Sequence, residues 1–123
     1  AAFEERLDSC QALLDGLVPG SRRWFRPPSG VMDSTMRHVL LQKGYAICLG
    51  DCYSSDPHIQ GDDYHVNTLL RGAKGGSVLI VHCPELGLRR QTLRIVPRLV
   101  DALRAKGLEL VTLDELFPAR DAE

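Results

Sequence analysis

The sequence alternates between amphipathic segments with helical spacing and short apolar segments with the character of strands. The helix-type segments fall at residues 3–17, 33–43, 62–72 and 92–106, and the strand-type runs at 23–26, 45–49, 76–82 and 108–113. Such alternation predicts an α/β fold in which parallel strands are joined by right-handed helical crossovers. Four helix–strand units are too few for a closed (β/α) barrel. We therefore expect either a small open sheet or part of a distorted barrel.

Length and composition limit the chain to an ordinary globular class. Its 123 residues suffice for one hydrophobic core, so we expect 1–123 to form a single domain, with a disordered tail at 118–123. The net charge of −1 gives no electrostatic case for nucleic acid. No apolar run approaches the ~20 residues of a membrane span. The first residues match neither a signal peptide nor a natural start, so we expect a fragment or a processed chain with no targeting segment of its own, and its compartment is left open.

The four cysteines do not indicate a metal or redox motif. Cys10, Cys48, Cys52 and Cys83 match neither a zinc ribbon nor a CxxC pair. Reduced packing thiols are the favoured interpretation, and secretion with one or two disulfides is left open.

Polar residues follow three of the predicted strands. Arg26 follows the first, Asp51 and Asp56 lie in the loop after the second, and His82 ends the apolar run 78–81. In a parallel sheet these strand ends share one edge, so the side chains can converge. A carboxylate beside His82 would orient its tautomer and stabilise the imidazolium, and an arginine would hold a carboxylate ionised. Taken singly, each residue could equally be a surface arginine, a turn-capping aspartate or a histidine that closes a strand.

Several motifs resemble the C-terminal portion of the polysaccharide deacetylase family, the NodB-homology or carbohydrate esterase family 4 group. They are Arg-Pro-Pro-Ser-Gly at 26–30, Tyr-Ser-Ser-Asp-Pro at 53–57, the run 78–82, and Lys-Gly-Leu-Glu-Leu-Val-Thr-Leu-Asp-Glu-Leu at 106–116. The resemblance implies a distorted (β/α) barrel that removes acetyl groups from N-acetylated sugars with a divalent metal, zinc or cobalt-like.

The resemblance also implies roles for individual residues. His82 would be the general acid, Asp56 would orient it, and Arg26 would steady the aspartate that acts as base. In the substrate pocket, the backbone amide at Ser29 would contribute to the oxyanion site next to Gly30. Ile80 would line the pocket for the acetyl methyl group, and Tyr53 would also bind substrate.

The sequence departs from the family pattern where the metal would bind. The Asp-Asp motif and the pair of histidines on one helical turn are absent, so the protein ligands for the metal are expected to be missing from this chain. His38, His58 and His65 are not placed to replace them, and we interpret His65 as a helix-start histidine beside capping residues. Ser29 stands where the family has an aromatic residue, Pro57 where it often has tryptophan, and Cys83 where aspartate is common.

Two functions are compatible with these features. The first is a metal-dependent carbohydrate N-deacetylase, acting on a polysaccharide or chitin-oligosaccharide-like substrate, in which this chain carries the general-acid half and is inactive alone. The alternative is a catalytically dead, deacetylase-like module that serves as a structural or binding subunit of a larger assembly. In either case a missing N-terminal half or a partner chain is expected to cover the exposed sheet edge. A small complete α/β domain that matches by chance is a third possibility.

Overall fold

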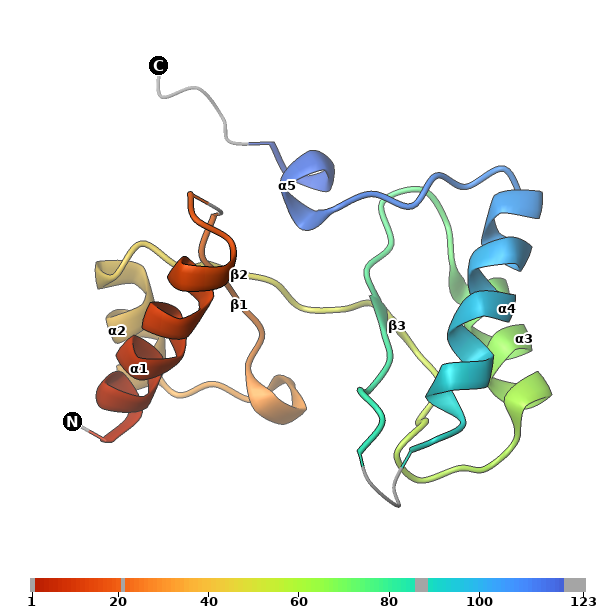
Figure 1. The fold of residues 1–123 in the computed structure, drawn as a ribbon, viewed down its shortest axis with the longest axis horizontal. Helices are drawn as coiled ribbons and strands as arrows, with labels where there is room; N and C mark the ends of the chain where they lie inside the picture. Colours follow the sequence, from red (N-terminus) through yellow and green to blue (C-terminus); the bar gives the residue numbers. More distant parts are fainter. Residues whose placement is uncertain (1, 21, 86–88, 119–123) are drawn as a thin grey trace. The chain divides into compact units, whose positions relative to one another are not determined.

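The chain divides into two compact units, Ala1–Leu49 and Gly50–Glu123 (Figure 1). The computed structural model describes residues 2–20, 22–85 and 89–118. Each unit has its own hydrophobic core. Most of the predicted tail, residues 119–123, lies outside the described residues.

The first unit packs two helices around a short parallel strand pair. Its elements are α1 (Ala2–Leu17), β1 (Trp24–Phe25), the 3₁₀ turn η1 (Pro28–Gly30), α2 (Ser34–Gln42) and β2 (Ala46–Ile47). Trp24 lies opposite Ala46 in the parallel register. The core is formed by Leu7, Leu40 and Tyr45.

Local sequence accounts for one helix of this unit better than for the other. The Asp33 side chain accepts a hydrogen bond from the Met36 amide at 2.7 Å, so α2 begins at a conventional N-cap. In α1, by contrast, the apolar residues do not form a fully buried stripe. Leu7 is buried, whereas Leu13 and Leu17 are 72% and 76% exposed within this structure.

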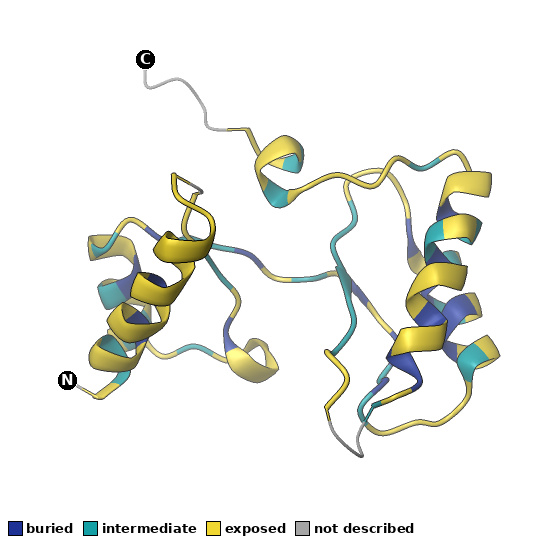
Figure 2. Ribbon diagram, in the orientation of Figure 1, coloured by how far each residue is buried: buried dark blue, intermediate teal, exposed yellow. Residues whose placement is uncertain are grey.

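The second unit contains the other parallel strand pair and two helices that share its core. Its elements are β3 (Cys52–Tyr53), α3 (Asp62–Gly72), β4 (Leu79–Ile80), α4 (Thr92–Ala105) and α5 (Leu113–Leu116). Cys52 lies opposite Leu79, and Tyr53 lies opposite Ile80. The core is formed by Cys52, Leu69, Ala73, Leu99 and Leu103. The buried positions of α3 and α4 therefore face each other (Figure 2).

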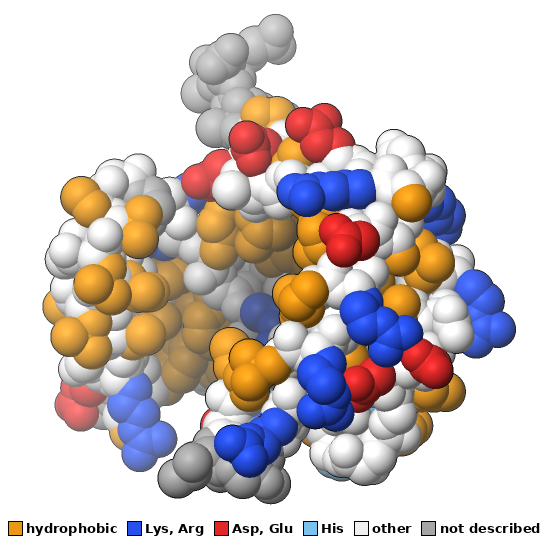
Figure 3. Space-filling view, turned by 45° about the vertical axis from the view of Figure 1, so that its right-hand side comes forward, with side chains coloured by type: hydrophobic (Ala, Val, Ile, Leu, Met, Phe, Trp, Pro, Cys, Tyr) orange, Lys and Arg blue, Asp and Glu red, His pale blue; other side chains and the backbone are white. Residues whose placement is uncertain are grey.

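The exposed sides of α3 and α4 are joined by ion pairs. Arg94 contacts Asp62 through two hydrogen bonds at 2.6 and 3.0 Å, and Arg98 contacts Asp63. The guanidinium of Arg94 lowers the pKa of the Asp62 carboxyl. Basic and acidic side chains are accordingly interspersed on the face of this unit that Figure 3 shows.

The predicted α/β class with parallel pairing is confirmed, but the predicted strand set is not. The strands in the described part of the chain form two separate two-stranded sheets. The strand predicted at 108–113 is wrong, because residues 108–112 are irregular and Thr112 caps α5 through a capping box with Glu115. A distorted barrel stays a prediction. Among the described helices, none has the length and apolar character to cross a membrane.

Candidate functional site

The second unit brings together two of the predicted site residues at one end of its sheet. Because β3 and β4 are parallel and in register, their carboxyl ends lie side by side. Asp56 follows β3 by three residues, and His82 follows β4 by two. The two loops therefore leave the sheet at the same edge, where ligands gather in open α/β folds.

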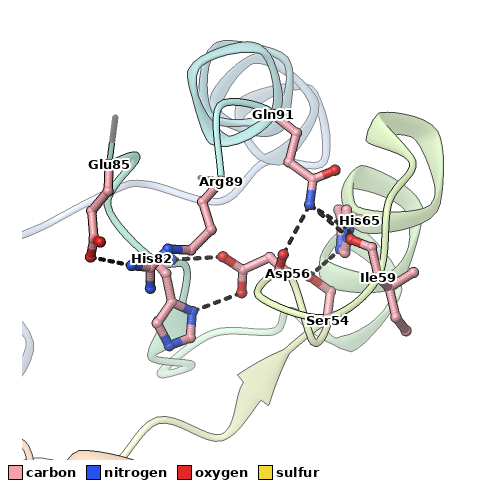
Figure 4. A network of polar contacts seen from close by, with 8 residues as sticks. All are labelled: Ser54, Asp56, Ile59, His65, His82, Glu85, Arg89 and Gln91. Carbon is pink, nitrogen blue, oxygen red and sulfur yellow. Dashed lines mark hydrogen bonds and ion pairs between the residues drawn. The ribbon is translucent and has the colours of Figure 1, made fainter. Parts of the chain in front are cut away.

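The carboxylate of Asp56 holds His82 at two points (Figure 4). Its Oδ1 lies 2.9 Å from the imidazole Nδ1, and its Oδ2 accepts the His82 backbone amide at 2.8 Å. Asp56 is only 1% exposed, whereas the His82 side chain is 31% exposed. The aspartate thus fixes both the backbone and the ring of a histidine that solvent can reach.

This arrangement assigns the proton on the imidazole of His82. An ionised carboxylate only accepts hydrogen bonds, so the Nδ1 atom that faces it carries the hydrogen. The Nε2 atom then remains as the position at which the ring can give or take a proton. A carboxylate at Nδ1 also stabilises the imidazolium that forms when Nε2 is protonated.

Behind Asp56, a buried glutamine fixes the backbone of the same loop. Gln91 is 3% exposed, and its Nε2 donates to the Asp56 carbonyl at 2.9 Å and to the Ile59 carbonyl at 2.8 Å. Its Oε1 accepts the Gly61 amide at 3.2 Å. These three contacts together determine the orientation of the side-chain amide, since the reverse orientation would oppose two carbonyls to an oxygen.

A buried histidine on α3 also supports this loop. His65 is fully buried, with Nδ1 2.8 Å from the Ser54 hydroxyl and Nε2 2.9 Å from the Ile59 carbonyl. A carbonyl only accepts, so Nε2 carries the hydrogen and Nδ1 accepts from Ser54. The Nε2 atoms of Gln91 and His65 therefore lie 3.4 Å apart as two donors that share one acceptor, the Ile59 carbonyl.

The placement of His65 near the start of a helix is confirmed, but the capping residues expected beside it are wrong. Gly61 is the N-cap of α3, and Asp62 and Asp63 lie in its first turn. The ring of His65 instead supports the Asp56 loop from inside the unit. The helical spacing of His65 with Val66 and Leu69 could have indicated an inward position. Ser54 belongs to the motif at 53–57 without having been assigned a role, and no local motif indicates Gln91.

Asp51, which precedes Asp56 in the same polar segment, contacts the residues before β4 and not His82. Its Oδ1 accepts the Val78 amide at 2.7 Å and its Oδ2 the Ser77 hydroxyl at 3.1 Å. The Val78 amide lowers the pKa of the Asp51 carboxyl. Asp51 thus fixes the entry into β4, while Asp56 binds the residue that leaves it.

The predicted substrate-binding residues are divided between the two units. Tyr53 and Ile80 are opposite each other in the β3–β4 pair, with Tyr53 63% exposed and Ile80 half-buried. Ser29 and Gly30 lie in η1 of the first unit, where both have positive φ, and Arg26 precedes this turn. The convergence of Arg26, Ser29 and Gly30 with the His82 pair stays a prediction.

The described residues do not fit a metal site. Nowhere in residues 2–20, 22–85 and 89–118 do three or more histidine, cysteine, aspartate or glutamate side chains gather in a way that could hold an ion. Both ring nitrogens of His65 are engaged by Ser54 and Ile59, so this histidine could ligate a metal only by losing those bonds. The expected zinc or cobalt-like ion therefore stays a prediction.

Comparisons with known proteins agree with the resemblance seen in the motifs. No family model matches the chain. A bifunctional xylanase/deacetylase of Pseudobutyrivibrio xylanivorans is 25% identical over 95 residues, which cover 77% of this chain and 15% of that protein. A family 4 carbohydrate esterase from Streptomyces lividans, solved in complex with acetate, is 28% identical with a TM-score of 0.67, covering 85% of this chain and 54% of the esterase.

The chain spans about half the length of that esterase and a much smaller part of the xylanase/deacetylase. Within this span the likeness extends to sequence and to three-dimensional structure alike. The chain is therefore a polysaccharide deacetylase-like polypeptide, similar to part of a family 4 carbohydrate esterase.

Proposed function

We propose that this chain takes part in removing acetyl groups from a carbohydrate and that His82 supplies the proton to the leaving group. The contact of the buried Asp56 carboxylate with both the ring and the backbone of His82 is the observation that carries this proposal. The relatives support the reaction class, since one is named a deacetylase and the other is an esterase solved with acetate.

The proposed step follows from the tautomer. As water adds to the acetyl carbonyl and the tetrahedral intermediate collapses, the bond between the carbonyl carbon and the sugar nitrogen breaks. The imidazolium Nε2 of His82 gives its proton to that nitrogen, so the products are acetate and the free amine. Asp56 stays ionised at Nδ1 and keeps the ring in position throughout. The residue that activates the water is not assigned to this chain.

We propose N-acetylated sugars of the chitin-oligosaccharide type as the substrate class. A basic nitrogen leaving group needs a proton at the moment the bond breaks, and the imidazole of His82, held in place by Asp56, is positioned to deliver one. Arg26, Ser29, Gly30, Tyr53 and Ile80 stay candidates for the surrounding pocket. The residues that bind a divalent metal would lie outside this chain.

The test measures acetate release from N-acetylated chito-oligosaccharides by the full natural protein that contains this chain, with zinc or cobalt added. His82→Ala should lower kcat/KM by roughly 10²–10⁴-fold, the usual contribution of a general acid. His38→Ala, which removes an exposed histidine of α2, is the matched control and should leave the rate unchanged. Wild-type protein without deacetylase activity, or unchanged activity in His82→Ala, would refute the proposal.

A further inference from the structure

The side chain of Gln91 forms hydrogen bonds with the loop that carries Asp56 and not with the helix that Gln91 precedes. Gln91 lies at the N-cap position of α4, yet it makes no side-chain capping bond. Its amide group instead reaches the Asp56 and Ile59 carbonyls and the Gly61 amide, at 2.8 to 3.2 Å. A glutamine that is 3% exposed thus directs its donors and its acceptor to a single neighbouring segment, residues 56–61.

These bonds act on the aspartate from the side opposite to the histidine. The Asp56 backbone is held through its carbonyl by Gln91, and its carboxylate is bonded to the ring and the amide of His82. Figure 4 shows Asp56 between the two residues, with Gln91 at the start of α4 and His82 after β4. The backbone from which the carboxylate extends is therefore held by the glutamine amide at the start of α4.

The second acceptor of Gln91 makes this support rigid. The Ile59 carbonyl receives hydrogen bonds from Gln91 and from His65, so both of its lone pairs are occupied. The loop between Asp56 and α3 is then fixed at Asp56, at Ile59 and at Gly61 by one side chain. Buried hydrogen-bond networks in which each member is satisfied confine their groups to one geometry.

We infer that Gln91 is a positioning residue for the proposed reaction, holding Asp56 so that its carboxylate keeps His82 in the Nδ1–H tautomer. This inference rests on the proposed function for its purpose but not for its geometry. Gln91 itself contacts neither the imidazole of His82 nor the side from which substrate would approach Nε2. Removing its amide should therefore loosen the histidine without removing the proton donor.

The first test is Gln91→Met in the 123-residue chain, which keeps the length of the side chain and removes the amide. We expect the slow-exchanging Nδ1–H signal of His82 in NMR spectra to broaden or disappear. We also expect the His82 amide to exchange roughly tenfold faster relative to the Val78 amide, which is bonded to Asp51 at the other end of β4. Leu103→Ala, a buried core position of α4, is the matched control for lost stability and should accelerate both amides alike.

A second measurement uses the wild-type chain and does not depend on the folding of a variant. The side-chain amide protons of Gln91 should exchange much more slowly than those of the exposed Gln42 and Gln60. Equally fast exchange at all three would overturn the inference. So would Gln91→Met with an unaltered His82 Nδ1–H signal, or with equal acceleration of the His82 and Val78 amides. These readouts are independent of acetate release, so an inactive full-length protein would refute the proposed function alone.

Discussion

Replacing Asp56 with asparagine changes one oxygen of the carboxylate to an NH₂ group and removes the charge. The remaining oxygen can face either the backbone amide of His82 or its ring, since the two donors contact different oxygens. The backbone amide can only donate, whereas the ring nitrogen can become an acceptor by moving its proton. We therefore expect the remaining oxygen to face the backbone amide and the NH₂ group to face Nδ1. His82 should then change to the Nε2–H tautomer.

The size of the effect follows from the two hydrogen bonds. A bond to a charged group contributes about 1.5–3 kcal/mol to stability and a neutral one about 0.5–1.5 kcal/mol. Converting two bonds of the first kind, at a side chain that is 1% exposed, into two of the second should lower the free energy of unfolding by about 2 kcal/mol. For a unit of the size of Gly50–Glu123, this corresponds to a decrease in Tm of roughly 8–16 °C.

The assay combines thermal unfolding by circular dichroism with ¹⁵N NMR of the histidine ring. The variant Asp56→Asn should exchange the protonated and unprotonated nitrogen signals of His82, and kcat/KM of the full protein should fall roughly 10²–10⁴-fold. Asp51→Asn is the matched control, because Asp51 also accepts two hydrogen bonds but is exposed at the other end of β4. An Asp56→Asn variant with the wild-type tautomer and an unchanged Tm would show that the carboxylate does not hold the ring.

Two further predictions concern the stability of the second unit. A Cβ at Gly72 would lie 2.7 Å from the Cys52 sulfur, so Gly72→Ala should destabilise the unit by about 1–2 kcal/mol. In a double-mutant cycle measured by urea unfolding, Cys52→Ala should relieve most of this loss, and additive effects of the two substitutions would contradict the prediction. The hydrogen bonds from Arg94 lower the pKa of Asp62, so at acid pH this carboxyl binds more protons in the unfolded chain than in the folded one. The contribution of the ion pair to folding stability is therefore present above about pH 4 and is lost as the pH falls. Arg94→Gln should therefore flatten the acid side of the stability curve, and an identical curve for the variant would refute the assignment.

Local patterns predicted the elements of this fold better than their burial. The helical spacing and the Asp33 cap place α2 correctly, because capping depends on neighbours in the chain. The predicted strand at 108–113 fails for a converse reason. Its apolar residues have the character of a strand, but Thr112 and Glu115 form a capping box that begins a helical turn instead. The exposure of Leu13 and Leu17 depends on what packs against α1, which the spacing of residues along one helix does not specify.

The pairing of Asp56 with His82 could be anticipated, and its support could not. Both residues are expected at the carboxyl edge of a parallel sheet. The sequence pattern assigns Asp56 to the loop after a strand at 45–49, however, whereas it follows β3, a strand that was not predicted and that pairs with β4. Gln91 lies 35 residues from Asp56 and reaches it through the packing of α4 on α3, which no local motif encodes. The supporting role of the His65 ring could not be predicted either, because both of its hydrogen-bond partners come from the loop before α3.

The hydrogen bond from the His82 backbone to Asp56 affects how related proteins should be compared. Every residue type except proline has that amide, so a homologue that has lost the imidazole would still place a hydrogen-bond donor on the aspartate. Selection for folding alone would then retain the carboxylate in a pseudoenzyme. An aspartate at this position is consequently a poor marker of surviving hydrolytic activity, and the histidine is the residue by which active and inactive members should be sorted.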